Sequence, residues 1–150
     1  MRFECDQGYV EVRFENYAGD AGCYCGNLPN ERNCVELCLN FSLKRIGWGC
    51  VRDEYMMTSD IAALANGAAQ ICLAKADSFS HATMFLYEVL LKDRTFSRFR
   101  FCRRAEGIEV ALRIWDGLCD YIEITQQLDE TAFGELADEL AAASRQFPER

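Results

Sequence analysis

Strict alternation of apolar and polar residues is the pattern that most constrains this chain. It is clearest at 108–114, where Ile108, Val110, Leu112 and Ile114 are each separated by one residue. Successive side chains of a strand point to opposite faces, so a period of two predicts a strand with one buried face. The same period recurs along much of the sequence, which predicts a β-rich domain.

Seven strands are expected. Three lie before residue 57, at about 10–14, 34–43 and 46–56, and four lie after residue 84, at about 85–91, 99–101, 108–114 and 121–126. In the third strand, Gly47 and Gly49 mark a weak or bulged point. Short connections between neighbouring strands favour antiparallel pairing.

Two segments change to the helical period. Thr58, Ser59 and Asp60 offer an N-cap cluster for a helix of about four turns, followed by apolar residues at helical spacing. A second helix is expected to begin after Asp129 as N-cap and to end at Pro148. The predicted order is β-β-β-α-β-β-β-β-α, an α+β fold of mostly antiparallel sheet, as a single domain over residues 1–150.

Charge narrows the choice of partner. The net charge is −8, although residues 92–104 hold six basic side chains and one acidic one. Arginines alternating on a strand beside an acidic strand are expected to form cross-strand pairs rather than a nucleic-acid surface. An acidic protein is a poor nucleic-acid binder and suits a basic protein partner. No apolar run is long enough to span a bilayer, and the amino-terminal residues lack an apolar signal region, so a cytoplasmic location is expected.

Nine cysteines raise the question of metal or disulfide chemistry. Cys34 and Cys38 fall on one predicted strand, about 13 Å apart, too far for one zinc ion or one disulfide. Cys23 and Cys25 lie in a predicted loop, where a structural zinc and free thiols both remain open. Free thiols in a reducing cytosol are the expectation, with no metal and no cofactor.

Catalysis is not expected. His81 is the only histidine, and although Ser78 and Ser80 lie near it, no acid or oxyanion hole is tied to it. The sequence also lacks phosphate-binding, dinucleotide-binding and zinc-protease motifs.

The last hairpin carries the candidate binding surface. Pairing Val110 with Ile124 and Leu112 with Ile122 places a common core face inward and leaves a three-residue loop, 116–118. The opposite face then combines tryptophan, tyrosine, arginine and acids, a composition typical of interface hot spots. The candidate interface residues are Trp115, Asp116, Asp120, Tyr121 and Glu123.

Four segments together resemble a known family. They are the opening strand GYVEVRFENY, the hydrophobic strand NCVELCLNFSLK, the capped helix MMTSDIAALANGAAQI and the closing acidic helix LDETAFGELADELAAASRQFPER. In their order, and above all in the closing helix with its Phe-Pro tail, the chain resembles the WapI family of bacterial immunity proteins.

The resemblance implies a small, non-enzymatic cytoplasmic protein that binds and neutralises a cognate toxin domain, often a nuclease. Nuclease toxins are commonly basic, so an acidic inhibitor suits them. Three other interpretations stay open: a metal- or redox-responsive module using Cys23 and Cys25, an enzyme using His81, and an α+β interaction domain of another kind.

Overall fold

The computed structural model describes residues 1–17, 33–44, 47–74, 85–90, 96–104, 107–115 and 121–150. The elements are, in chain order, β1 (Arg2–Cys5), β2 (Gly8–Tyr17), β3 (Cys34–Leu43), β4 (Gly47–Met57), α1 (Thr58–Leu73), β5 (Phe85–Leu90), β6 (Phe96–Arg104), β7 (Gly107–Trp115), β8 (Tyr121–Leu128) and α2 (Glu130–Gln146).

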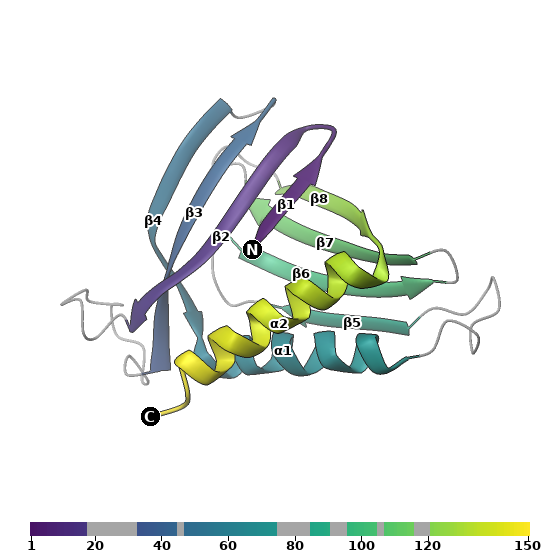
Figure 1. The fold of residues 1–150 in the computed structure, drawn as a ribbon. Coiled ribbons are helices and arrows are strands. Elements are labelled where there is room, and N and C mark those ends of the chain that lie inside the picture. The colour runs from purple at the N-terminus through teal and green to yellow at the C-terminus, as the bar shows by residue number, and fades with distance from the viewer. Residues whose placement is uncertain (18–32, 45–46, 75–84, 91–95, 105–106, 116–120) are drawn as a thin grey trace.

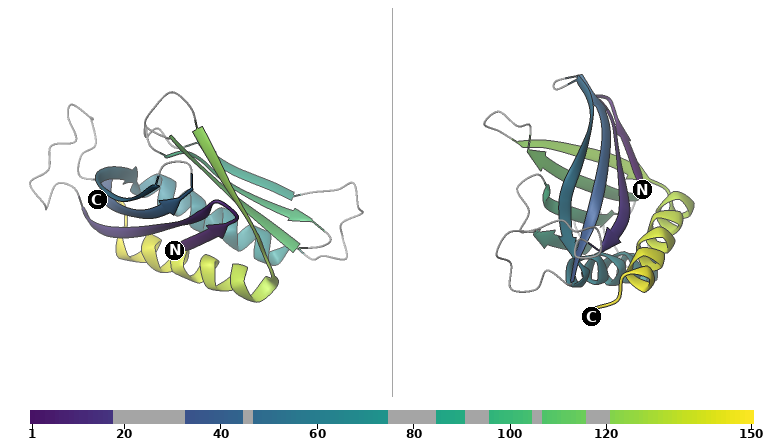
Figure 2. Two further views of the ribbon diagram at one scale, coloured as in Figure 1. Left: turned by 90° about the horizontal axis from the view of Figure 1, so that it is seen from above. Right: turned by 90° about the vertical axis from the view of Figure 1, so that its left-hand side faces the viewer.

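The strands form two four-stranded antiparallel sheets, ordered β1-β2-β3-β4 and β5-β6-β7-β8. The sheets are set at an angle to each other, and α1 and α2 lie side by side along the bottom of the view in Figure 1. Figure 2 shows the same arrangement from two further sides. The expected α+β fold, with one helix in the middle and one at the carboxyl end, is confirmed. Neither helix of the described part has the length and apolarity that crossing a bilayer requires.

Strand β1 is an addition to the expected order. Its four residues pair with β2 from Arg2 opposite Glu11 to Cys5 opposite Gly8. So short a segment shows too little alternation to be separated from β2 in the sequence. Gly8 follows the tight turn with a φ of 132°, in a region that residues with a Cβ atom rarely adopt.

The bulge expected near Gly47 and Gly49 lies elsewhere. The register between β3 and β4 shifts between Leu37 and Leu39, whereas Phe41 pairs with Gly49 without interruption. A Cβ atom on Gly49 would come within 2.8 Å of the Phe41 ring. Gly49 therefore leaves room for an aromatic ring on the neighbouring strand rather than marking a break in pairing.

The two helices begin in different ways. Asp129 caps α2, because its carboxylate accepts a hydrogen bond from the Ala132 amide at 2.8 Å, as expected. The cap expected at Thr58, Ser59 or Asp60 is wrong. β4 runs directly into α1, so Met57 occupies the N-cap position without a side-chain cap, and Thr58 is already helical and buried.

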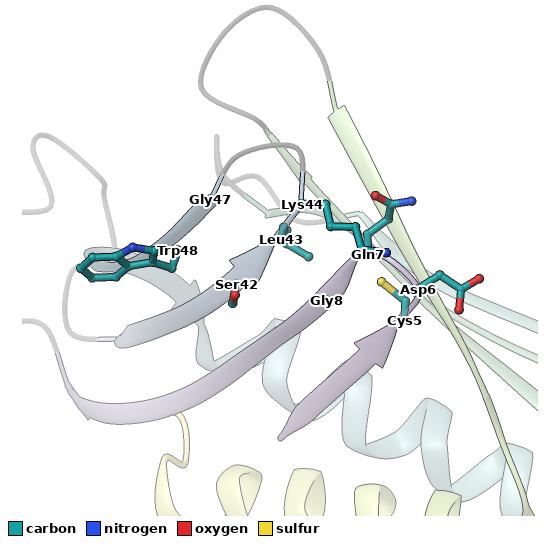
Figure 3. Close-up of a pocket in the computed structure, with 9 residues that line it drawn as sticks. All are labelled: Cys5, Asp6, Gln7, Gly8, Ser42, Leu43, Lys44, Gly47 and Trp48. Carbon is teal, nitrogen blue, oxygen red and sulfur yellow. The ribbon is translucent and has the colours of Figure 1, made fainter.

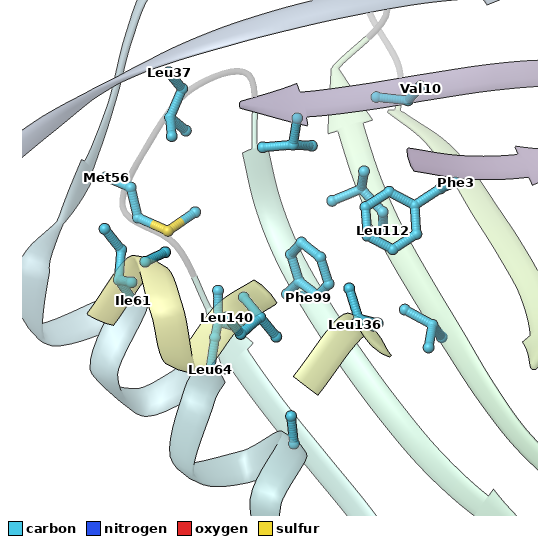
Figure 4. Packing of buried hydrophobic residues seen from close by; sticks show 14 of the residues in the cluster. Phe3, Val10, Leu37, Met56, Ile61, Leu64, Phe99, Leu112, Leu136 and Leu140 are labelled. Carbon is cyan, nitrogen blue, oxygen red and sulfur yellow. The ribbon is translucent and has the colours of Figure 1, made fainter. Parts of the chain in front are cut away.

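One cluster of buried apolar side chains draws on both sheets and both helices. Its centre is a series of edge-to-face aromatic contacts with ring centroids 5.5–5.6 Å apart. The series runs from Phe3 on β1 through Phe99 and Phe101 on β6 to Phe133 on α2. Figure 4 shows Phe3 beside Leu112, with Leu136 and Leu140 of α2 below Phe99. These contacts hold the two sheets and α2 in one core.

The carboxyl-terminal tail packs back on the first sheet. The Phe147 ring lies 5.3 Å from the Tyr17 ring, and the Tyr17 hydroxyl donates to the Pro148 carbonyl at 2.5 Å. The Arg150 amide donates to the Asn33 side chain at 2.8 Å, just before β3 begins. The Phe-Pro tail is therefore a docked structural element.

Candidate binding surface

The candidate surface lies on the face of the second sheet that points away from the core. We call this the hairpin face. Its described side chains come from alternate positions of β6, β7 and β8. The polar ones are Arg100, Arg104, Glu109, Arg113, Glu123, Thr125 and Gln127, and the buried Cys102 and Ala111 lie among them. The residues between them, such as Val110, Leu112 and Ile124, are buried in the core, as the period of two predicts.

An ion-pair network crosses the hairpin face. The Arg100 Nη2 atom lies 3.1 Å from Glu109 Oε1 and 3.2 Å from Glu123 Oε1, so one arginine joins three strands. The Gln127 amide donates to the other Glu109 oxygen at 3.2 Å. The expectation that the arginine strand pairs with acids across the sheet is confirmed at Arg100. The network fixes the direction of three charged side chains on a partly exposed face.

The register of the last hairpin differs from the prediction. Leu112 pairs with Ile124 and Ile114 with Ile122, so the connection spans residues 116–120 rather than three residues. A shift of two residues leaves every side chain on the same face, so alternation alone could not choose between the two registers. The predicted face is therefore correct, although its pairs are wrong.

The five candidate interface residues are only partly described. Glu123 has an exposed side chain and lies opposite Arg113. Trp115 and Tyr121 are cross-strand partners at the end of the hairpin, and their side chains lie outside the described part. Asp116 and Asp120 also fall outside the described residues. The structure thus brings Glu123 together with Arg100 and Arg113. Neither arginine is among the five candidate interface residues.

A second polar face, which the sequence did not single out, covers the first sheet. We call it the first-sheet face, and it comprises Arg2, Tyr9, Glu11, Arg13, Cys38, Asn40, Ser42, Trp48 and Cys50. Trp48 is 87% exposed. The Arg2 guanidinium lies 4.1 Å from the centre of the Tyr9 ring. Alternation in the sequence places Cys38, Asn40 and Ser42 on one face of their strand, but nothing in it reveals the exposure of a tryptophan between two glycines.

An acidic side chain on the first-sheet face is held ionised. The Asn40 amide donates to Glu11 Oε2 at 3.0 Å, and this hydrogen bond, aided by the Arg13 charge, lowers the pKa of Glu11 against the opposing effect of burial.

An open pocket of about 390 Å³ lies where the turn ends of the first sheet meet. Its lining includes Cys5, Asp6, Lys44 and Trp48. Figure 3 shows Trp48 at one end and Asp6 at the other, with no convergence of polar groups on one point. Such a pocket lacks the few aligned polar groups that orient a small molecule.

Some of the described cysteines contact neighbouring sulfur atoms, and the described residues form no metal site. Cys34 and Cys38 lie on one strand as expected, and each points to a different partner: Cys34 Sγ is 3.4 Å from Met57 Sδ, and Cys38 Sγ is 3.5 Å from Cys50 Sγ. Among the described residues, no three metal-binding side chains gather. Cys23 and Cys25 lie outside the described residues, as do Ser78, Ser80 and His81.

Comparison with known proteins returns no match to a protein-family model, to a curated protein or to a solved structure. The fold and its faces define an α+β protein with two sheets and a partly exposed sheet face that carries an ion-pair network.

Proposed function

We propose that this chain is a non-enzymatic cytoplasmic immunity protein that binds and neutralises a basic toxin domain through the hairpin face. The observation that carries the proposal is the exposed carboxylate of Glu123, fixed by Arg100 at 3.2 Å on a partly exposed sheet face. A prearranged carboxylate in an acidic protein is suited to pairing with a basic partner. The resemblance to WapI-family immunity proteins names the kind of partner.

Charge supports the proposal at two levels. The net charge of −8 attracts a basic partner over a distance and raises the association rate. Glu123 acts at contact, because its side chain is 40% exposed and its orientation is already determined before binding. A group that needs no reordering on binding costs less conformational entropy.

A second candidate is an interaction domain that uses the first-sheet face. Trp48 favours it, since an 87% exposed tryptophan is a common anchor in protein interfaces. In this candidate the chain also binds a protein partner, but through the first-sheet face instead of the hairpin face.

The test is co-expression with the carboxyl-terminal domain of the large secreted protein encoded next to this chain. We expect the two to elute as one complex whose affinity falls with salt, and we expect the complex to suppress toxicity. A folded toxin domain that forms no complex would overturn the proposal.

Three variants separate the faces. Glu123→Lys should raise the dissociation rate, whereas Glu135→Lys, an equal charge change at an exposed position of α2, should alter only the association rate. Asp120→Lys should behave like Glu123→Lys and flatten the salt dependence. If Trp48→Ala weakens the complex and Glu123→Lys acts like Glu135→Lys, the first-sheet face is the binding surface.

A further inference from the structure

Two thiols on adjacent strands of the first sheet lie within bonding reach of each other. Cys38 Sγ on β3 and Cys50 Sγ on β4 are 3.5 Å apart. Cys50 pairs with Asn40, so the two cysteines are diagonal neighbours, and Cys38 lies at the register shift between Leu37 and Leu39. A disulfide bond is about 2.05 Å long, so the sulfurs need to approach by only about 1.5 Å.

The two thiols differ in access. Cys50 is exposed, whereas Cys38 has no exposed surface. A reagent from solution therefore reaches Cys50 first. The sulfur of Cys38 is in contact with Cys50 Sγ and with Asn40 Oδ1, which lies 4.0 Å away.

The surroundings of Cys38 suit the second step of an exchange. The Arg13 Nη2 atom lies 3.9 Å from Cys38 Sγ, so a positive charge adjoins the sulfur. Burial, together with the contact to Cys50, raises the pKa of Cys38, which therefore rests as a neutral thiol. Cys38 can react once Cys50 carries a mixed disulfide, because the two sulfurs are already in contact and no second molecule has to collide with Cys38.

We propose that Cys38 and Cys50 form a redox-active dithiol, a modification site that a low-molecular-weight disulfide such as oxidised glutathione converts into a cross-strand disulfide. Cys50 is the attacking thiol and Cys38 the resolving thiol. This inference is independent of the immunity function, and it places redox chemistry on the sheet rather than at Cys23 and Cys25.

The exchange balances in two steps. The Cys50 thiolate attacks one sulfur of the small disulfide, forms a mixed disulfide and releases one thiolate, which takes up the proton that Cys50 lost. The Cys38 thiolate then attacks the Cys50 sulfur, breaks the mixed disulfide and releases the second thiolate, which takes up the proton of Cys38. The two protein thiols are oxidised by two electrons, and the small disulfide is reduced to two thiols.

The test treats the folded protein with oxidised glutathione, alkylates the remaining thiols and maps the peptides by mass spectrometry. Cleavage after Lys and Arg isolates Cys50, and cleavage after Glu36 separates Cys34 from Cys38. We expect a linked pair of peptides that contain Cys38 and Cys50 and that come apart on reduction.

Variants assign the order of attack. Cys50→Ser, at an exposed position, should keep the fold and lose the linked pair. Cys38→Ala should accumulate the glutathione adduct on Cys50. Cys34→Ala, a buried cysteine on the same strand, should still give the linked pair. Wild-type protein that retains the adduct on Cys50 as Cys38→Ala does, or that links other cysteines instead, would overturn the proposal.

Discussion

Arg103 Nη2 on β6 lies 2.5 Å from Glu130 Oε1 in the first turn of α2. Its Nη1 atom donates to the second Glu130 oxygen at 3.0 Å and to the Ile71 carbonyl of α1 at 3.3 Å. Arg103 is only 4% exposed. One arginine of the basic segment therefore points inward and joins the second sheet to both helices.

Removing Glu130 should destabilise the fold, because it leaves a buried guanidinium with one fewer partner. We expect Glu130→Ala to lower the free energy of unfolding by about 1–3 kcal/mol. The Glu130 side chain is 63% exposed, so the loss should stay below the larger cost of breaking a fully buried pair. Urea denaturation measures it. Glu135→Ala, at an exposed position one turn on, is the control and should change little; equal losses would contradict the pairing argument.

Substitutions at the starts of the two helices should differ in their effect on stability. Asp129→Ala should cost about 1 kcal/mol, since the Ala132 amide loses its acceptor. Ser59→Ala should cost only a few tenths, because Ser59 is exposed within α1 and Met57 holds the N-cap position. Thermal and chemical unfolding of both variants compare them. A loss at Ser59 as large as at Asp129 would show that α1 is capped by a side chain after all.

Two glycines should respond in opposite directions to alanine. Gly8→Ala places a Cβ atom 1.8 Å from the Ser42 carbonyl oxygen at a φ of 132°, so it should destabilise by more than the roughly 1–3 kcal/mol of backbone strain alone. Gly134→Ala lies within α2 with no heavy atom within 4 Å and should stabilise by about 0.5–1 kcal/mol. Denaturation midpoints of the two variants measure whether each change in stability is a loss or a gain. A Gly8→Ala variant as stable as the wild type would mean that the β1–β2 turn can relax.

Glu11 should link stability to pH. Its pKa is lowered in the folded state, mainly by the hydrogen bond from Asn40. Its contribution is therefore present above the ordinary glutamate pKa and is lost as pH falls through the lowered value. Asn40→Ala should raise the pKa of Glu11 and reduce stability at neutral pH, with the difference shrinking in acid. NMR titration of the Glu11 carboxyl measures the pKa, with Ser42→Ala as control. An unchanged pKa would assign the effect to Arg13 instead.

Most elements could be predicted because their signals are local. Alternation located β3 and β7 closely and the middle of β2, and the Asp129 cap located the start of α2. β1 was missed because four residues carry too little periodicity. The cap of α1 was misplaced because polar residues at 58–60 resemble a cap, whereas the direct run of β4 into the helix decides which residue occupies that position.

The candidate site was predictable only as a face. Period-two alternation assigned Glu123 and Arg113 to the side away from the core, and that assignment survives a shift of register. The ion pairs of Arg100 and the exposure of Trp48 depend on which strands become neighbours. The contact between Cys38 and Cys50 depends in addition on a register shift that no local pattern marks.

The sequence by itself determined the fold class, the order of most elements and the buried side of the strands with clear alternation, such as β3 and β7, since these follow from short-range periodicity and capping. Only the tertiary structure decided that the strands divide into two sheets, that Arg103 points inward to Glu130, and that two separate cysteines meet. Each of these depends on contacts between residues far apart in the chain, whose pairing is selected by the packing of the whole core.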